Sequence, residues 1–188
     1  YAFSTTKFPK KSESVNRELN TILFVGQLSP RKGIKVLVDA FSLLKLKLPE
    51  AKLWLVGAIN GIDEELIKKQ GIEYFGVLKK DALKHKFESA SLFCLPSFEE
   101  GLALVLTEAK YFKLPIVAAK NTGVQDLFKV NEDGYALFET ANPQDLATKL
   151  ELALKTKHTL IDKKIEDVSW LDFTKTILQK IEAHEKNI

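Results

Sequence analysis

Short apolar runs alternate along the chain with longer segments in which apolar positions recur at helical spacing. The apolar runs cover residues 21–25, 52–56, 72–75, 91–95, 115–119 and 135–138. Most of these runs lack the alternation of polar and apolar side chains that a strand with one wet face shows. We therefore expect strands that are buried on both faces, as in a parallel sheet.

Helical patterns fill the intervals between these strands, and the first of them places Ile34, Leu37 and Phe41 on one face. The Asn142-Pro143 pair predicts the start of another helix, because Asn is a favoured N-cap and Pro suits the first helical position. This alternation of strands and helices predicts an α/β fold. We expect a Rossmann-like doubly wound parallel sheet of about six strands with helices on both faces.

The two ends of the chain depart from this pattern. Residues 1–20 are polar and are predicted to be a linker, whereas residues 21–155 form the predicted Rossmann-like domain. Residues 156–188 begin with a charged stretch and continue into a last helix after Ser169, which we expect to leave the main body. The sequence holds no methionine, so we expect it to be part of a longer chain or the product of processing.

Composition limits the classes of function. The 188 residues, of which 45% are hydrophobic and 28% charged, are typical of one globular domain with an ordinary core. A net charge of +3 is too small to indicate a nucleic-acid partner. The single cysteine, Cys94, is expected in the core; it excludes an internal disulfide framework and favours a cytoplasmic setting. No apolar run approaches the roughly 20 residues that span a bilayer, and no signal peptide is visible.

Some polar residues carry little information about function. His85, His158 and His184 are expected on the surface. The basic run 79–86 predicts a solvated helix face, with contact to lipid headgroups at the inner face of a membrane as the alternative. The sequence has no Asp-x-Asp pair and no His/Cys cluster at ligand spacing, so we expect no metal and no other cofactor.

Residues 95–109 carry the strongest chemical signal, because a strand end, a glycine-containing loop and a helix follow one another directly. The amides after Gly101, through Leu102, Ala103 and Leu104, are expected to be free at the helix start, where an anion such as a diphosphate binds. Glu100 precedes them and could contact a transferred sugar. The alternative is an acid that merely stabilises a helix N-terminus.

Two further positions fit the same ligand. Glu108 lies about 9 Å along the predicted helix, near the distance from a diphosphate to its ribose, and a carboxylate accepts hydrogen bonds from both ribose hydroxyls. The loop 26–33 ends in Arg31 and Lys32, cations that suit a pyrophosphate beside helix amides. The alternatives are an exposed helical glutamate and a solvated basic pair. Because parallel strands share one carboxyl edge, we expect these loops to converge on a nucleotide-sugar.

Together these residues resemble the C-terminal, donor-binding domain of the retaining family-4 glycosyltransferases, which have the GT-B fold of two Rossmann-like domains. The resemblance covers the chain from its first residues, similar to an interdomain linker, to the last helix, similar to one that crosses back to an N-terminal domain. The phosphate loop of the family is matched by Gly26…Arg31-Lys32-Gly33, and its Glu-x7-Glu signature by Pro96-Ser97…Glu100-Gly101…Glu108-Ala109.

The resemblance implies transfer of a sugar from a nucleotide-sugar, with retention at the anomeric carbon and without a metal. Lys32 and Glu100 would be the catalytic residues. Lys32, with Arg31, would bind the diphosphate together with the amides of residues 102–104, whereas Glu100 would contact the donor sugar. Glu108 would hold the ribose and Leu78 would border the base. A glycan or lipid acceptor would bind an N-terminal domain outside this chain, so the chain alone is expected to be inactive.

Two departures from the family pattern leave an alternative open. Gln27 stands where the family usually has Arg, and Ala103 stands where it usually has Gly. These residues favour a non-catalytic GT-B-like domain that serves as a partner subunit or scaffold. An epimerase of the same fold fits less well, because the Glu-x7-Glu context favours transfer.

Overall fold

The computed structural model describes residues 16–100, 104–122 and 135–156. Six parallel strands form one sheet in the order β3-β2-β1-β4-β5-β6. The strands are β1 (Thr21–Val25), β2 (Lys52–Val56), β3 (Ile72–Tyr74), β4 (Leu92–Leu95), β5 (Ile116–Ala119) and β6 (Tyr135–Phe138). Each predicted strand is present with ends shifted by at most one residue, so the predicted fold class is confirmed.

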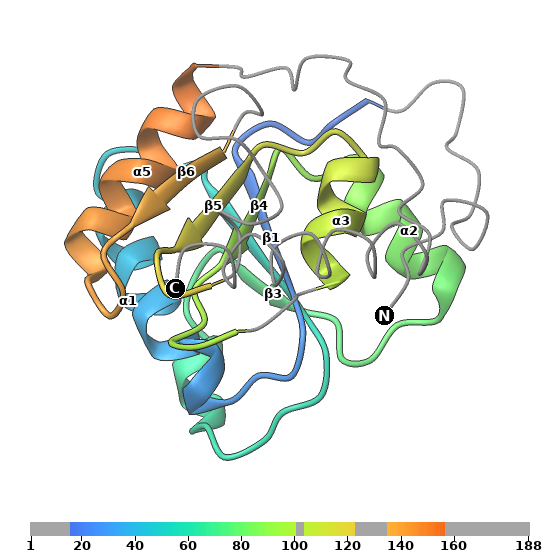
Figure 1. Cartoon of the computed structure of the whole chain (residues 1–188), viewed down its shortest axis with the longest axis horizontal. Coiled ribbons are helices and arrows are strands. Elements are labelled where there is room, and N and C mark those ends of the chain that lie inside the picture. The colour runs from blue at the N-terminus through green and yellow to red at the C-terminus, as the bar shows by residue number, and fades with distance from the viewer. Residues whose placement is uncertain (1–15, 101–103, 123–134, 157–188) are drawn as a thin grey trace, which may run out of the picture. The chain divides into compact units, whose positions relative to one another are not determined.

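Helices cover both faces of this sheet (Figure 1). The described α-helices are α1 (Ile34–Lys45), α2 (Lys80–Ser89), α3 (Leu104–Tyr111) and α5 (Pro143–Lys155). In Figure 1, α1 and α5 lie on one side of the strands, and α2 and α3 lie on the other. Short 3₁₀ turns at Pro30–Lys32 and Glu64–Ile67 complete the described elements, and the second of these was not predicted. The last helix expected after Ser169 lies outside the described residues.

The central strands are apolar throughout because both faces are covered. Ile22 and Phe24 of β1 belong to a buried cluster with residues of α1 and α5. On the opposite face, the ring of Phe93 in β4 stacks on that of Phe87 in α2, with 5.9 Å between centroids, and Phe87 stacks on Phe112 at 5.4 Å. The edge strand β3 differs, since its Tyr74 is 40% exposed. Cys94 is fully buried in β4 as expected, and this burial raises the pKa of its thiol.

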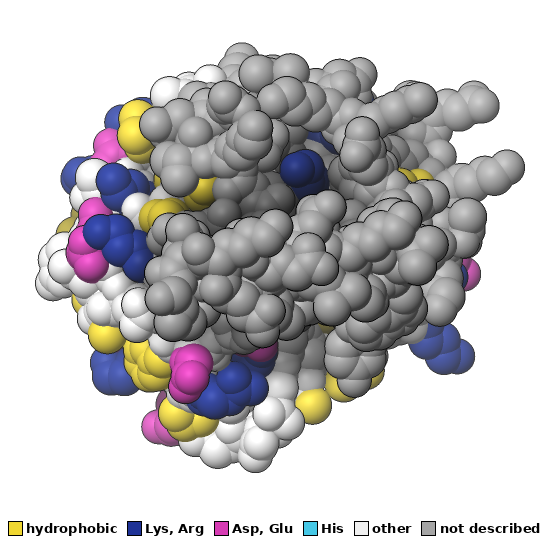
Figure 2. Space-filling view, in the orientation of Figure 1, with side chains coloured by type: hydrophobic (Ala, Val, Ile, Leu, Met, Phe, Trp, Pro, Cys, Tyr) yellow, Lys and Arg dark blue, Asp and Glu magenta, His cyan; other side chains and the backbone are white. Residues whose placement is uncertain are grey.

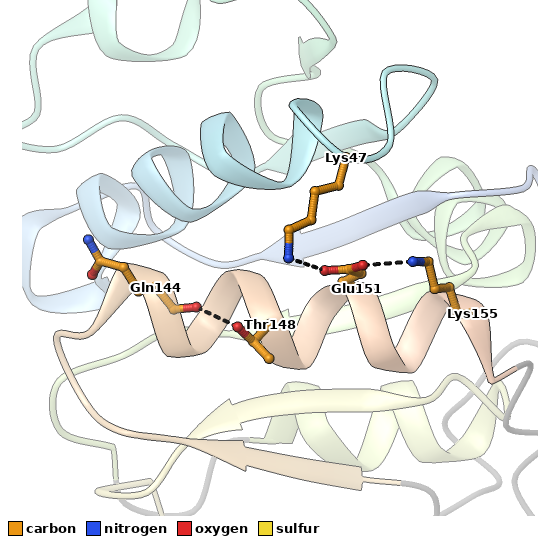
Figure 3. A network of polar contacts seen from close by, with 5 residues as sticks. All are labelled: Lys47, Gln144, Thr148, Glu151 and Lys155. Carbon is orange, nitrogen blue, oxygen red and sulfur yellow. Dashed lines mark hydrogen bonds and ion pairs between the residues drawn. The ribbon is translucent and has the colours of Figure 1, made fainter.

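Helices α1 and α5 pack against each other, and an ion pair of Lys47 with Glu151 connects the turn after α1 to α5 (Figure 3). The Nζ atoms of Lys47 and Lys155 each lie 2.7 Å from a carboxylate oxygen of Glu151 (Figure 3). Helix α5 begins as predicted, because the side chain of Asn142 accepts a hydrogen bond of 3.0 Å from the backbone amide of Asp145. The N-cap prediction is therefore confirmed at the level of individual atoms.

Arg17, in the segment that leads into β1, connects the ends of two helices. Its guanidinium donates hydrogen bonds of 2.8 Å to the carbonyl oxygens of Phe112 and Lys113, just beyond α3, and one of 3.5 Å to that of Ala90, which ends α2. A helix leaves its last carbonyl groups without partners inside the helix, and cationic side chains satisfy them well. No sequence pattern predicted this contact.

The basic run 79–86 is only partly the solvated face that was expected. Lys79, Lys80 and His85 are exposed. The prediction is wrong for Lys86, whose Nζ lies 3.4 Å from the ring centroid of Phe75 and 3.9 Å from that of Trp54. The ammonium group of Lys86 is partly removed from water in this position, and this burial lowers its pKa because it disfavours the charged form. On the face seen in Figure 2, Lys or Arg and Asp or Glu side chains are interspersed over the described surface.

Candidate functional site

The strand order reverses between β1 and β4, which lie side by side in the middle of the sheet. The chain moves outward from β1 through β2 to β3, and from β4 through β5 to β6 in the opposite direction. In open parallel sheets, the loops that leave two such strands diverge and open a crevice at the carboxyl edge, where ligands bind. We therefore expect a ligand site between the loops that follow β1 and β4.

The loop after β1 ends in a tight turn that carries the two predicted cations. Pro30–Lys32 forms a 3₁₀ turn, in which the amide of Gly33 donates a hydrogen bond of 2.9 Å to the carbonyl oxygen of Pro30. Gly33 then takes a left-handed conformation with φ of 68° and serves as the N-cap of α1. A left-handed backbone is one that glycine adopts without steric cost.

The loop after β4 packs directly onto this turn. A Cβ atom on Gly33 would lie 2.0 Å from the carbonyl oxygen of Pro96, so the two backbones approach more closely than any side chain would allow. The amide of Phe98 donates a hydrogen bond of 3.0 Å to the carbonyl oxygen of Arg31. The Arg31 guanidinium donates one of 3.1 Å to the carbonyl oxygen of Glu99. These contacts hold the two loops in register.

Lys32 and Glu100 form an ion pair between the two loops. Nζ of Lys32 contacts Oε2 of Glu100, and the side chains are only 17% and 16% exposed. Charges shielded in this way interact more strongly than a pair on the open surface. The structure thus brings together the two residues that were predicted to be catalytic, although they are 68 positions apart in the sequence.

Helix α3 places Glu108 one turn beyond Leu104, its first residue, or about 6 Å along the helix axis. Leu104 is 40% exposed. The side chain of Glu108 is half-buried, and this desolvation raises the pKa of its carboxyl group. Within the described segments, the Glu108 carboxylate has no hydrogen-bond or ion-pair partner. A half-buried acid without a partner is a group that a ligand hydroxyl can satisfy.

The remaining predicted positions differ in what the structure shows. Leu78 lies after β3, at the same carboxyl edge but two strands away from β1, and it is half-buried. Gln27 is exposed in the loop after β1. The predicted amide positions Gly101, Leu102 and Ala103 lie outside the described residues.

Sequence reasoning missed three features of this site. It assigned Lys32 and Glu100 to separate parts of a ligand and did not predict that they pair; opposite charges on neighbouring loops were the available signal. It also missed how closely Gly33 approaches Pro96, which no local pattern reveals. Finally, Oγ of Ser97 is buried without a hydrogen-bond partner in the part of the chain that the structure describes.

In residues 16–100, 104–122 and 135–156, the side chains of His, Cys, Asp and Glu do not gather in groups that could hold a metal ion. Over the same ranges, each helix is too short or too polar to cross a bilayer.

Comparison with known proteins identifies relatives over most of the chain. The family model described as glycosyl transferases group 1 matches residues 5–166. An uncharacterized glycosyltransferase of Haemophilus influenzae is 33% identical over 153 residues, which cover 77% of this chain and 42% of that protein. A GalNAc-α-(1→4)-GalNAc-α-(1→3)-diNAcBac-PP-undecaprenol α-1,4-N-acetyl-D-galactosaminyltransferase of Campylobacter jejuni is 32% identical over 143 residues, or 74% of this chain and 40% of that protein. The chain therefore spans less than half the length of these relatives.

Solved structures show the same fold. The C-terminal domain of a glycosyl transferase group 1 family protein, LpcC of Francisella tularensis, superposes with a TM-score of 0.67 at 18% identity, covering 79% of this chain and 88% of that chain. The Anabaena protein HepE, solved in complex with UDP and glucose, superposes with a TM-score of 0.69 at 18% identity, covering 88% of this chain and 48% of that chain.

Proposed function

Because this chain belongs to the glycosyl transferases group 1 family, we propose that it forms the nucleotide-sugar donor site of a retaining glycosyltransferase. The observation that carries this proposal is the ion pair of Lys32 and Glu100 at the point where the strand order reverses. The structural neighbour that binds UDP and glucose supports a nucleotide-sugar as the donor.

In this proposal, each charged residue has its own role. Lys32, with Arg31 beside it, neutralises the donor diphosphate and the charge that develops on it as the sugar leaves. Glu100 accepts hydrogen bonds from hydroxyls of the transferred hexose or related sugar. Glu108, one turn into α3, accepts hydrogen bonds from the ribose hydroxyls, which provide partners for its half-buried carboxylate. The amides of residues 102–104 would complete the diphosphate site, and Leu78 would border the base.

The proposed reaction needs no metal. A leaving diphosphate requires positive charge, and Lys32, Arg31 and the amide end of a helix supply it at this site. The acceptor, a glycan or lipid, binds a part of the enzyme outside this chain, which spans 42% of the Haemophilus influenzae relative. The chain by itself is therefore expected to bind the donor without turning it over. A cytoplasmic enzyme that meets a lipid acceptor at the inner face of a membrane fits this proposal.

Titration calorimetry of the chain with UDP, GDP and ADP tests the proposal. We expect one of these nucleotides to bind, and Lys32→Ala to weaken its binding at least tenfold, because the diphosphate loses its cation. Lys35→Ala is the matched control, since Lys35 is a neighbouring lysine paired with Asp39 on the exposed side of α1. Absence of binding at millimolar concentration, or equal losses in the two variants, would contradict the proposal.

The alternative is a non-catalytic partner subunit or scaffold, which the exposed Gln27 favours because it removes a cation from the loop after β1. The pair of substitutions Lys32→Ala and Glu108→Ala, made in the full-length protein, separates the two functions. An enzyme loses its cellular activity with either substitution, whereas a scaffold keeps it.

A further inference from the structure

We propose that the Lys32–Glu100 ion pair makes the donor site selective for a diphosphate that carries a sugar over a free nucleoside diphosphate or pyrophosphate. This inference rests on the proposed function, because it takes Lys32 as the cation that meets the diphosphate. It adds a property that neither residue has alone, because each side chain is the ion-pair partner of the other.

Lys32 and Glu100 neutralise each other's charge. Lys32 and Glu100 are each about five-sixths shielded from solvent, and their side chains are in direct contact. A ligand diphosphate cannot use the full charge of Lys32 without competing with the Glu100 carboxylate. The affinity that is measured for any diphosphate is therefore lowered by the free energy of separating or sharing the pair.

The surrounding loops prevent the pair from moving apart. Gly33 lies against the carbonyl of Pro96, and the amide of Phe98 is bound to the carbonyl of Arg31. The Arg31 guanidinium is bound in turn to the carbonyl of Glu99, the residue next to Glu100. Because backbone contacts fix both loops, the Glu100 carboxylate stays close to any ligand group that binds the Lys32 ammonium.

Two kinds of ligand then meet different environments. A free nucleoside diphosphate that takes Lys32 leaves a shielded carboxylate without its cation and close to further negative charge, and both effects weaken binding. A nucleotide-sugar brings hydroxyl groups that donate hydrogen bonds to the same carboxylate, so Glu100 exchanges one partner for another. Selectivity arises because only the second ligand satisfies both members of the pair.

The same balance favours release of the product. A nucleoside diphosphate without its sugar offers Glu100 no hydroxyl that could donate a hydrogen bond. The Lys32–Glu100 ion pair therefore re-forms and competes with the bound nucleoside diphosphate. The pair therefore lowers product affinity while it preserves affinity for the intact donor.

Calorimetry of Glu100→Gln with inorganic pyrophosphate, with UDP, GDP and ADP, and with UDP-glucose, GDP-mannose and ADP-glucose tests this inference. We expect pyrophosphate and the bound nucleoside diphosphate to gain roughly two- to tenfold in affinity, because Lys32 is released from its partner. The corresponding nucleotide-sugar should gain less or lose affinity. Glu100→Asp, which withdraws the carboxylate by one methylene, should show a smaller gain in the same direction and serves if the first variant does not fold.

Two controls isolate the pair. Glu99→Gln removes an exposed neighbouring charge and should leave pyrophosphate affinity unchanged. In the Lys32→Ala background, Glu100→Gln should increase affinity by a smaller factor, because only the repulsion between the carboxylate and the diphosphate is then relieved; the difference between the two factors in this double-mutant cycle reports the coupling of the two residues. Unchanged or weaker diphosphate binding in Glu100→Gln, or an equal gain in Glu99→Gln, would overturn the inference. If Lys32→Ala alone leaves nucleotide binding intact, the proposed function fails instead.

Discussion

Replacing Gly33 with alanine tests how closely the two loops of the site must approach. A Cβ atom at this position would lie 2.0 Å from the carbonyl oxygen of Pro96. The usual separation of a carbon and a carbonyl oxygen is about 3.3 Å, so the loops after β1 and β4 must move apart by about 1 Å. That movement pulls Lys32 away from Glu100, so we expect the fold to be less stable.

The magnitude follows from two separate costs. A non-glycine residue in the left-handed region costs about 1–2 kcal/mol, and forcing extra volume into a packed site costs about 1–3 kcal/mol. We therefore expect Gly33→Ala to lower the free energy of unfolding by about 2–5 kcal/mol in urea titrations, with an unchanged m-value. Affinity for a nucleotide-sugar should fall as well, because Lys32 and Glu100 are then no longer held close enough together to contact the diphosphate and the sugar of one ligand.

Gly76 provides a matched control in the same chain. Its φ of 63° is close to the 68° of Gly33, but a Cβ atom there would meet no heavy atom within 4 Å. Gly76→Ala should thus lose only the backbone term, about 1–2 kcal/mol. Equal losses of stability in the two variants would refute this reasoning, because the close contact with Pro96 would then add no cost at position 33.

Two further substitutions test the energetics of single side chains. Because burial raises the pKa of Glu108, its ionised form destabilises the fold at neutral pH. Glu108→Gln should raise the free energy of unfolding at pH 7–8 by about 1 kcal/mol at most, since the carboxylate keeps some contact with water. This gain in stability should shrink as the pH falls through the raised pKa. It should vanish below about pH 4, where the carboxyl group is neutral in the folded and the unfolded chain. A gain that does not change with pH would contradict this cause. Arg17→Ala should cost about 2–4 kcal/mol in urea titrations, because carbonyls of Phe112 and Lys113 lose a charged donor. Arg17→Lys should recover only part of this loss, and full recovery would show that charge alone matters.

Local patterns were sufficient for the elements of the fold. A run of buried apolar residues such as 22–24 is typical of a strand covered on both faces, and amphipathic helices supply the cover. The Asn142 cap was predictable because its hydrogen bond to Asp145 spans three residues. The parts of the candidate site were visible for the same reason, as each is a short motif in one loop or one helix turn.

The sequence by itself therefore determined which segments become strands and helices, and which charged residues stand at the ends of strands. Only the tertiary structure decided that β1 and β4 are neighbours, and with that the pairing of Lys32 with Glu100 across 68 residues. The tertiary structure alone also decided three other contacts: Gly33 with Pro96, Arg17 with the ends of α2 and α3, and Lys86 with the rings of Trp54 and Phe75. The physical reason is that these contacts depend on where whole elements pack, which periodicity within one element does not encode.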